Sequence, residues 1–145
     1  MGELGFSLLE VLVVLGILAV ALALVAPSFN RARSSLAVRG AAYELAAHLR
    51  ATRAAANAQS VQKMLVFDQT ARRYWAEGAP PRVLPQSVRV GLVVPESEQV
   101  GRTARIRFLP DGSASGGKIV FQDGKAAWSV VVDWLSGDVR VASGS

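Results

Sequence analysis

The sequence begins with a long apolar run that contains almost no polar side chain. Residues 6–26 read FSLLEVLVVLGILAVALALVA, a stretch of 21 residues in which only Ser7 and Glu10 are polar. At about 1.5 Å per residue this stretch forms a helix of roughly 31 Å, which matches the apolar thickness of a lipid bilayer. The pattern therefore predicts a membrane-spanning helix over residues 6–26.

Glu10 is the unusual residue of this helix. An ionised carboxylate inside a membrane costs about 2.5–3.5 kcal/mol on insertion scales, so by default it is a functional group that needs a partner. A suitable cation arises if the chain is cut between Gly5 and Phe6, because the cut creates an α-ammonium group. One chain cannot comfortably make this pair with itself, but a neighbouring subunit in a helical stack can supply it.

The helical pattern continues over residues 27–58 but changes character. Alternating steps of four and three place six residues on one helix face: Val38, Ala42, Leu45, Leu49, Thr52 and Ala56. This stripe is narrow and rich in alanine, so the helix can lie close against a sheet. We therefore expect an amphipathic helix that continues the apolar one.

Beyond Asn57 the period changes from helical to alternating. Strands are expected at residues 61–67, 72–76, 87–94, 103–109, 118–122, 127–134 and 138–142. A four-residue loop at 68–71 joins the first two strands as a hairpin. The predicted fold class is α+β, with one long N-terminal helix packed on an antiparallel β domain of residues 59–145.

The three tryptophans are interpreted as core aromatics of this β domain. They are Trp75, Trp128 and Trp134. On the strand at 127–134, alternation places Trp128, Val130, Val132 and Trp134 on one face.

The residues around Gly5 resemble a known processing signal. Gly5, then Phe6-Ser-Leu-Leu-Glu10, then an apolar helix, is similar to the cleavage site of type IV prepilins and type II secretion pseudopilins. The resemblance implies that residues 1–5 are a leader, removed by a prepilin peptidase that also methylates the new N-terminal Phe6. It also implies that Glu10 recruits the subunit to a filament and pairs with an adjacent N-terminus.

The β half resembles one branch of this pilin-like superfamily, the GspH/FimT minor pseudopilins and minor pilins. Together with Trp75, the residues that carry the resemblance are Ile106-Arg-Phe-Leu-Pro-Asp-Gly112, Gly117-Lys-Ile-Val-Phe121, Val130-Val-Val132 and Gly137-Asp-Val-Arg140. The branch implies a structural, tip or initiator subunit of a type IV pilus, a competence pilus or a type II secretion pseudopilus. The sequence does not separate these systems.

The resemblance also implies a location and a set of partners. The chain would be a single-pass protein of the bacterial inner membrane with its β domain outside the cytoplasm, and later part of a pilus or pseudopilus. Its partners would be other pilins or pseudopilins, the prepilin peptidase and the inner-membrane assembly platform. A generic single-pass anchored envelope protein is the alternative.

The charges beside the apolar run conflict with this orientation. The leader carries Glu3 but no Lys or Arg, whereas Arg31, Arg33 and Arg39 follow the run. The positive-inside rule, taken alone, would orient the segment the other way. A longer basic leader, lost through a misassigned start, would remove half of the conflict.

The charge of the remaining chain raises a second functional hypothesis, that of a membrane-tethered minor pilin that acts as a DNA receptor in transformation. From residue 30 onward, 16 basic groups face 9 acidic ones, so this part carries +7 and attracts polyanions. Some FimT-type minor pilins take up DNA through a C-terminal Gly-Arg-x-Arg element, and here the matching stretch is Gly137-Asp-Val-Arg140. The candidate DNA-binding residues are Arg105, Arg107 and Arg140, with Arg50 and Arg53 as a second patch.

The sequence contains no clear pattern for a metal site, a phosphate-binding loop or a catalytic site. Cysteine is absent, and His48 is the only histidine, without carboxylates at metal-binding spacing. The glycine-rich stretch 112–118 nearly spells a phosphate-binding loop, but Ile119 stands where such a loop needs a hydroxyl. We expect neither an enzyme nor a cofactor or metal site.

Overall fold

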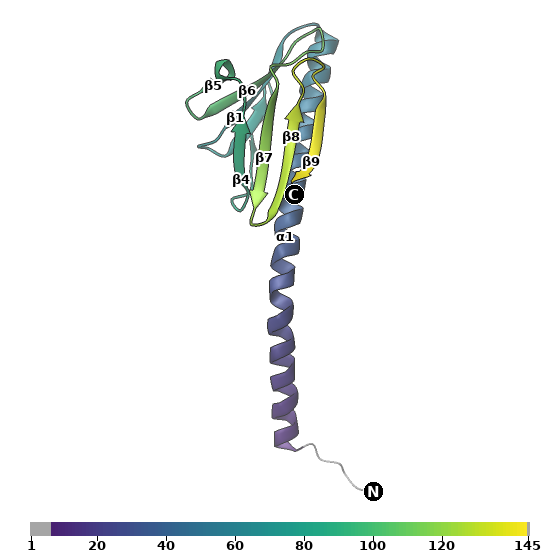
Figure 1. The fold of residues 1–145 in the computed structure, drawn as a ribbon, viewed down its shortest axis with the longest axis vertical. Helices are drawn as coiled ribbons and strands as arrows, with labels where there is room; N and C mark the ends of the chain where they lie inside the picture. The colour runs from purple at the N-terminus through teal and green to yellow at the C-terminus, as the bar shows by residue number, and fades with distance from the viewer. Residues whose placement is uncertain (1–6, 145) are drawn as a thin grey trace. The chain divides into compact units, whose positions relative to one another are not determined.

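The computed structural model describes residues 7–144, and within this range it describes the side chains of all residues except 25–34. The predicted cleavage site, Gly5 and Phe6, lies outside the described residues. Helix α1 spans Leu8–Gln59 (Figure 1). After it come β1 (Lys63–Asp68), β2 (Arg73–Ala76), β3 (Arg82–Val83), β4 (Arg89–Val93), the 3-10 helix η1 (Glu96–Glu98), β5 (Gln99–Val100), β6 (Thr103–Phe108), β7 (Gly117–Asp123), β8 (Ala126–Val132) and β9 (Val139–Gly144).

The chain divides into two compact units, Met1–Arg33 and Ser34–Ser145. In the first unit, the Ser7 hydroxyl accepts a hydrogen bond from the Leu9 amide at 3.2 Å and so caps the start of α1. Within the described residues, the structure contains no helix that is both long enough and apolar enough to span a membrane. The span predicted over residues 6–26 stays a prediction.

The second unit contains two antiparallel sheets. One has the strand order β3-β2-β1-β6-β5 and the other β4-β7-β8-β9. The predicted hairpin is confirmed, with Asp68 paired to Arg73, so that its loop is 69–72, one residue later than expected. The two-residue strands β3 and β5 were missed, because each adds only two residue pairs to a neighbouring strand.

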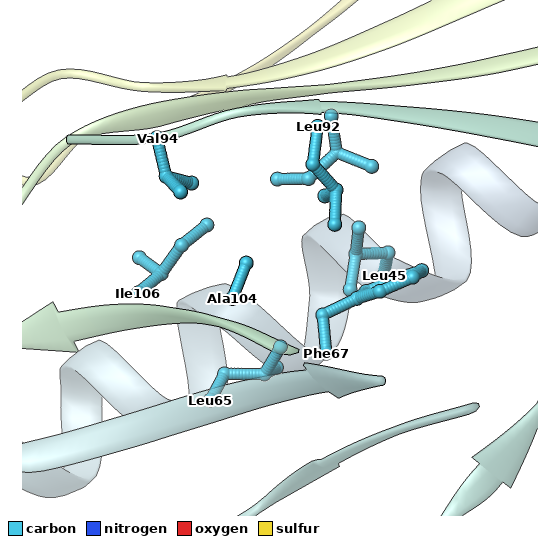
Figure 2. Close-up of a pocket in the computed structure, with 8 residues that line it drawn as sticks. Leu45, Leu65, Phe67, Leu92, Val94, Ala104 and Ile106 are labelled. Atoms are coloured by element: carbon cyan, nitrogen blue, oxygen red, sulfur yellow. The ribbon is translucent and has the colours of Figure 1, made fainter. Parts of the chain in front are cut away.

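A small apolar cavity lies within the second unit. Figure 2 shows Leu92 and Val94 facing Ala104 and Ile106 of β6. The cavity measures about 10 Å³. A space of this size admits at most about one water, and an apolar lining leaves that water without partners. This cavity is therefore a packing feature of the core and not a ligand site.

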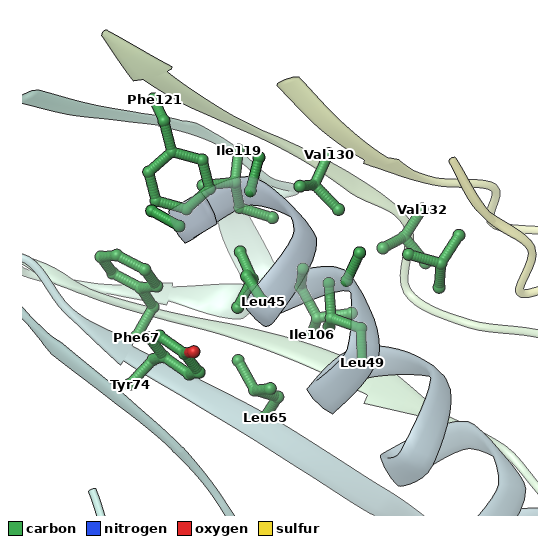
Figure 3. Packing of buried hydrophobic residues seen from close by; sticks show 14 of the residues in the cluster. Leu45, Leu49, Leu65, Phe67, Tyr74, Ile106, Ile119, Phe121, Val130 and Val132 are labelled. Carbon is green, nitrogen blue, oxygen red and sulfur yellow. The ribbon is translucent and has the colours of Figure 1, made fainter. Parts of the chain in front are cut away.

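The helix stripe predicted from the sequence is confirmed, since all six of its residues are buried. Ala41 and Ala46 are buried as well and widen the stripe. Figure 3 shows Leu45 and Leu49 of α1 among core side chains from both sheets, including Phe67 and Phe121. Every residue of this core belongs to Ser34–Ser145. Because it contains its own core, we expect this unit to fold without the residues before it.

The interpretation of Trp134 as a core residue on the face of β8 is wrong. Strand β8 ends at Val132, and the Trp134 side chain is 66% exposed in the turn that follows. The strand stops because one oxygen of the Asp133 carboxylate accepts hydrogen bonds from the Leu135 amide at 3.0 Å and the Ser136 amide at 2.8 Å. These bonds form an Asx turn that alternation cannot anticipate.

The other two tryptophans are only partly buried. Trp128 does pack against the core cluster, whereas Trp75 lies outside it, beside Val66 and under the Arg73 guanidinium, so its interpretation as a core residue is also wrong. The aromatic side chains that are buried are Phe67, Tyr74, Phe108 and Phe121. Tryptophan is large, so it is seldom fully enclosed even where it contributes to a core.

Candidate functional site

The described start of α1 presents an apolar surface on all sides. Its large apolar side chains are between 46% and 82% exposed. They are Leu8, Leu9, Val11, Leu12, Val13, Val14, Leu15, Ile17, Leu18, Val20, Leu22 and Leu24. A helix that is apolar all round is stable only when lipid or other protein covers it. This surface is therefore a candidate contact surface.

Glu10 lies exposed in the first turn of α1, within this apolar surface. Its amide bonds the Ser7 carbonyl at 2.9 Å. Glu10 is the only ionisable residue in the sequence from 7 to 24, so a cationic partner must come from outside this segment. The partner that the sequence predicts, a free N-terminus at Phe6 of another subunit, lies outside the described residues.

The structure brings Arg105 and Arg107 together on one face of β6, as expected for alternate residues of the strand predicted at 103–109. Both lie next to the carboxylate of Glu98, which is only 3% exposed. The burial of Glu98 was not predicted from the sequence. The Arg107 guanidinium donates to Oε1 of Glu98, and Nε of Arg105 lies 3.9 Å from Oε2. Two of the candidate DNA-binding residues thus share one buried anion.

A tight hairpin brings Glu98 to this position. Strand β5 pairs with β6 through Gln99 opposite Ala104 and Val100 opposite Thr103, which places Glu98 next to Arg105. Gly101 makes the turn at a φ of 60°, a left-handed conformation that favours glycine. The sequence does contain this signal, a glycine between Val100 and Arg102, although residues 95–98 alone read as a solvated polar loop.

Arg50, Arg53 and Arg140 gather at a second place, the turn between β8 and β9. Arg50 donates to the Val139 carbonyl at 2.8 Å, and Arg53 donates to the Ser136 carbonyl at 2.7 Å. These two bonds join α1 to the turn. The second basic patch predicted from the helix therefore also fixes the position of the last hairpin.

Asp138 occupies the position at which the Gly-Arg-x-Arg element expected from the resemblance has its first arginine, and it bonds Arg140. Nε of Arg140 donates to Oδ2 of Asp138 at 2.9 Å, and this hydrogen bond lowers the pKa of Asp138 below its ordinary value. Asp138 therefore stays ionised and offsets the charge of Arg140.

Gly137 allows this turn to form. Its φ is 65°, and a Cβ added there would lie 2.3 Å from the Gly112 carbonyl oxygen. Any side chain would force the two loops apart. In the same turn, hydrogen bonds from Ser136 hold the pKa of Asp133 below its ordinary value. The close approach of Gly137 to Gly112 and the hydrogen bonds between Ser136 and Asp133 together fix the conformation of this turn.

His48 lies beside a buried ring and not in a metal site. Its imidazole packs edge-on against Tyr74 at 5.7 Å between centroids, with Nε2 at 4.0 Å from a Glu44 oxygen. Among the described residues, no three His, Cys, Asp or Glu side chains are grouped so that they could hold a metal ion. In the glycine-rich stretch, Lys118 belongs to strand β7, whereas a phosphate-binding loop needs a helix at this point.

Comparison with known proteins gives matches over most of the chain. The family model described as "Type II transport protein GspH" matches residues 41–137. The curated "Type II secretion system protein H" of Xanthomonas campestris pv. campestris is 33% identical over 137 residues, which cover 94% of this chain and 81% of that protein.

Two solved structures are similar in fold. The minor pseudopilin EpsH from the Type 2 Secretion System of Vibrio cholerae has a TM-score of 0.59 at 12% identity, over 73% of this chain and 96% of that one. The type IV minor pilin FimU of Pseudomonas aeruginosa has a TM-score of 0.54 at 13% identity, over 74% and 92%. Both support the pilin-like α+β fold expected from the sequence.

Proposed function

The chain belongs to the GspH family of type II transport proteins, and from this membership we propose that it is a minor pseudopilin or minor pilin. Such a protein is a structural subunit of a type II secretion pseudopilus or a type IV pilus, without enzymatic activity. A position at the tip, where the subunit would initiate assembly, is the finer form of this proposal.

The observation that carries the proposal is the exposed apolar segment of α1 with its single carboxylate. Side chains from Leu8 to Leu24 are exposed on every side of the helix, and Glu10 is their only charge. A surface of this kind is covered in a membrane before assembly and by neighbouring helices after it. Glu10 then pairs with the N-terminal ammonium of an adjacent subunit, which fixes the register between the two.

The family implies a place in the cell envelope and assembly with other pseudopilins in a filament. The finer proposal is a single-pass protein of the inner membrane with its β domain outside the cytoplasm. A prepilin peptidase cuts between Gly5 and Phe6 and methylates Phe6. The inner-membrane assembly platform then moves the subunit into the filament.

Mass spectrometry of the assembled protein tests this proposal. Intact mass and N-terminal peptides are measured on chains from sheared filaments, or from cross-linked assemblies in the envelope. We expect loss of residues 1–5 and a methyl group on Phe6. The variant Gly5→Leu, which places a bulky side chain at the cut, should retain the leader and be absent from assemblies. An assembled chain that begins at Met1 or Gly2 would contradict the proposal.

DNA binding stays a prediction of the sequence. All five candidate arginines have partners within the described residues, which leaves fewer free donors than the net charge implies. Phosphate contacts would make binding independent of sequence, and each contact that is lost lowers the slope of log K against log salt by about 0.7–0.9. Gel-shift titrations of the wild-type chain and of Arg140→Gln at several salt concentrations measure this slope directly.

A further inference from the structure

A small polar pocket opens on the five-stranded sheet, on the face opposite the one that packs on the core. It measures about 140 Å³ and is lined by Gln62, Met64, Glu98, Arg105 and Arg107. The Glu98 side chain is 4% exposed, while each of the two arginine side chains is 37% exposed. The Glu98 carboxylate is thus enclosed by the protein, whereas the Arg105 and Arg107 side chains reach solvent.

The two guanidinium groups have more donors than the chain itself uses. Each guanidinium offers five N–H donors. Arg107 donates to Glu98, and Arg105 makes one long bond of 3.5 Å to the Ser97 carbonyl. Nε of Arg105 is 3.9 Å from Glu98, too far for a hydrogen bond. Two cations against one carboxylate leave a net charge of +1, which suits one further monoanion.

The neighbours of the pocket limit what that anion can belong to. Across the strands, Met64 lies opposite Arg107, and Val66 lies between Arg105 and Trp75. These neutral side chains are partly buried. A nucleic-acid backbone needs a succession of cations along its path. The next cation, Arg73, lies 5.6 Å over the Trp75 ring, but its guanidinium is 3.9 Å from the Asp68 carboxylate, so this face keeps a net charge of +1. A single net charge beside apolar side chains fits an acidic side chain flanked by apolar residues.

We propose that Arg105 and Arg107 form a docking site for one carboxylate of a neighbouring protein subunit, with Glu98 as the residue that positions both arginines. The identity of the partner as another subunit rests on the proposed function. The Glu98 carboxylate bonds Arg107 and attracts Arg105 at ion-pair distance before the partner arrives, which reduces the side-chain ordering that binding requires. Met64, Val66 and Trp75 contact the apolar residues next to the partner's carboxylate.

The site can be tested on the unit Ser34–Ser145, which contains the whole core. The probes are two capped peptides, acetyl-Leu-Glu-Leu-amide and acetyl-Leu-Gln-Leu-amide, titrated while the Nε–H resonances of the arginines are followed by NMR. We expect the glutamate peptide to shift the signals of Arg105 and Arg107 and to bind at least fivefold more tightly than the glutamine peptide. The variant Arg105→Gln leaves the Glu98–Arg107 pair intact and should weaken binding at least fivefold.

Two further variants make the result specific. Arg89→Gln removes an exposed arginine from β4 in the other sheet and should change nothing. Arg107→Lys keeps the charge but loses the forked donor geometry, so it should weaken binding even where circular dichroism shows an unchanged fold. Equal affinity for the two peptides, or wild-type affinity in Arg105→Gln, would overturn the proposal.

Single-stranded DNA serves as the competing probe. An unlabelled oligothymidylate of ten nucleotides is added in place of the peptides. Shifts of Arg105 and Arg107 at lower concentrations of DNA than of glutamate peptide would also overturn the proposal, because they would assign the pocket to phosphates. The NMR titration requires no filament. Its failure alongside a normally processed and assembled chain therefore contradicts only the docking site and not the subunit role.

Discussion

Two stretches of helix α1 differ in which of their side chains the protein itself covers. From Leu8 to Leu24 the helix is apolar on all sides and its side chains are exposed, whereas from Ser35 to Gln59 a stripe along one side is buried by the two sheets. Sheets that pack on one side of a helix can cover such a stripe, whereas an all-round apolar surface needs neighbours on every side. The width of the apolar surface thus distinguishes a stretch of helix that its own chain covers from one that we propose other subunits cover.

The two units also differ in whether a carboxylate has a positively charged partner within the same unit. Glu98 is buried in the second unit between two arginines of its own chain. Glu10 is the single ionisable residue of a segment that contains no cation. A carboxylate in apolar surroundings is stable only when a counter-charge is close. Glu98 has this partner within the fold, and we expect Glu10 to obtain it from another chain.

The largest expected difference between the two stretches is in stability. Leu49→Ala removes a fully buried side chain from the helix stripe and should lower the free energy of unfolding by about 2–5 kcal/mol. Leu15→Ala removes an exposed leucine from the same helix and should change it by less than about 0.5 kcal/mol. Urea unfolding of the detergent-solubilised chain, followed by near-UV circular dichroism, measures both. A comparable loss in both variants would contradict the division into a packed and an unpacked stretch.

A smaller loss is expected at the turn that α1 holds through Arg50 and Arg53. In Gly137→Ala, a φ of 65° is combined with a Cβ placed 2.3 Å from the Gly112 carbonyl oxygen. This variant should lower the free energy of unfolding by about 1–3 kcal/mol. Gly101→Ala is the matched control, since its φ is 60° but its Cβ would meet open space. Thermal unfolding of Ser34–Ser145 compares them, and equal losses would show that the contact with Gly112 does not matter.

The smallest expected effect concerns pH and again belongs to the second unit alone. The pKa of Asp133 is held below its ordinary value of 3.8 by hydrogen bonds from Ser136. A carboxylate whose pKa is lowered by folding stabilises the folded state at pH values above its ordinary pKa. This stabilisation is lost as the pH falls through the pKa of the folded state. The wild-type unit should therefore lose more thermal stability between pH 5 and 3 than Asp133→Asn. An equal fall in melting temperature between pH 5 and 3 in the two proteins would contradict this role of Asp133.

The sequence predicted those features that depend on periodicity. The six-residue stripe from Val38 to Ala56 is confirmed, because burial on one side repeats along a helix. The strand predicted at 103–109 is confirmed at Thr103–Phe108, where Ala104, Ile106 and Phe108 are buried and alternate with the two arginines. The antiparallel character of the β domain is confirmed as well, because strands joined by short loops, such as β1 and β2, can pair only in antiparallel fashion. Its division into two sheets was not predicted, since periodicity does not determine which strands pair.

Features that depend on single contacts were missed. Trp134 lies outside the core because the Asp133 carboxylate ends β8 at Val132, two residues earlier than alternation indicates. Glu98 is buried because a two-residue strand brings it back against Arg105. Both errors involve short-range hydrogen bonding, which overrides the hydrophobic pattern over three or four residues. The assembly residue Glu10 and the cleavage site at Gly5 and Phe6 stay predictions.

The most direct test of the central claim, that the apolar segment of α1 is an assembly surface centred on Glu10, is the variant Glu10→Leu. Removing the charge should favour membrane insertion by about 2–3 kcal/mol, so the chain should reach the membrane fraction at wild-type levels or above. Assembly should nevertheless fail, because the N-terminal ammonium of the neighbouring subunit loses its counter-ion. The measurement is the ratio of sheared-filament to membrane-bound chain, with Ser7→Ala as the control that keeps the charge. We predict a ratio near zero for Glu10→Leu and a wild-type ratio for Ser7→Ala, and entry of Glu10→Leu into filaments at wild-type levels would contradict the account.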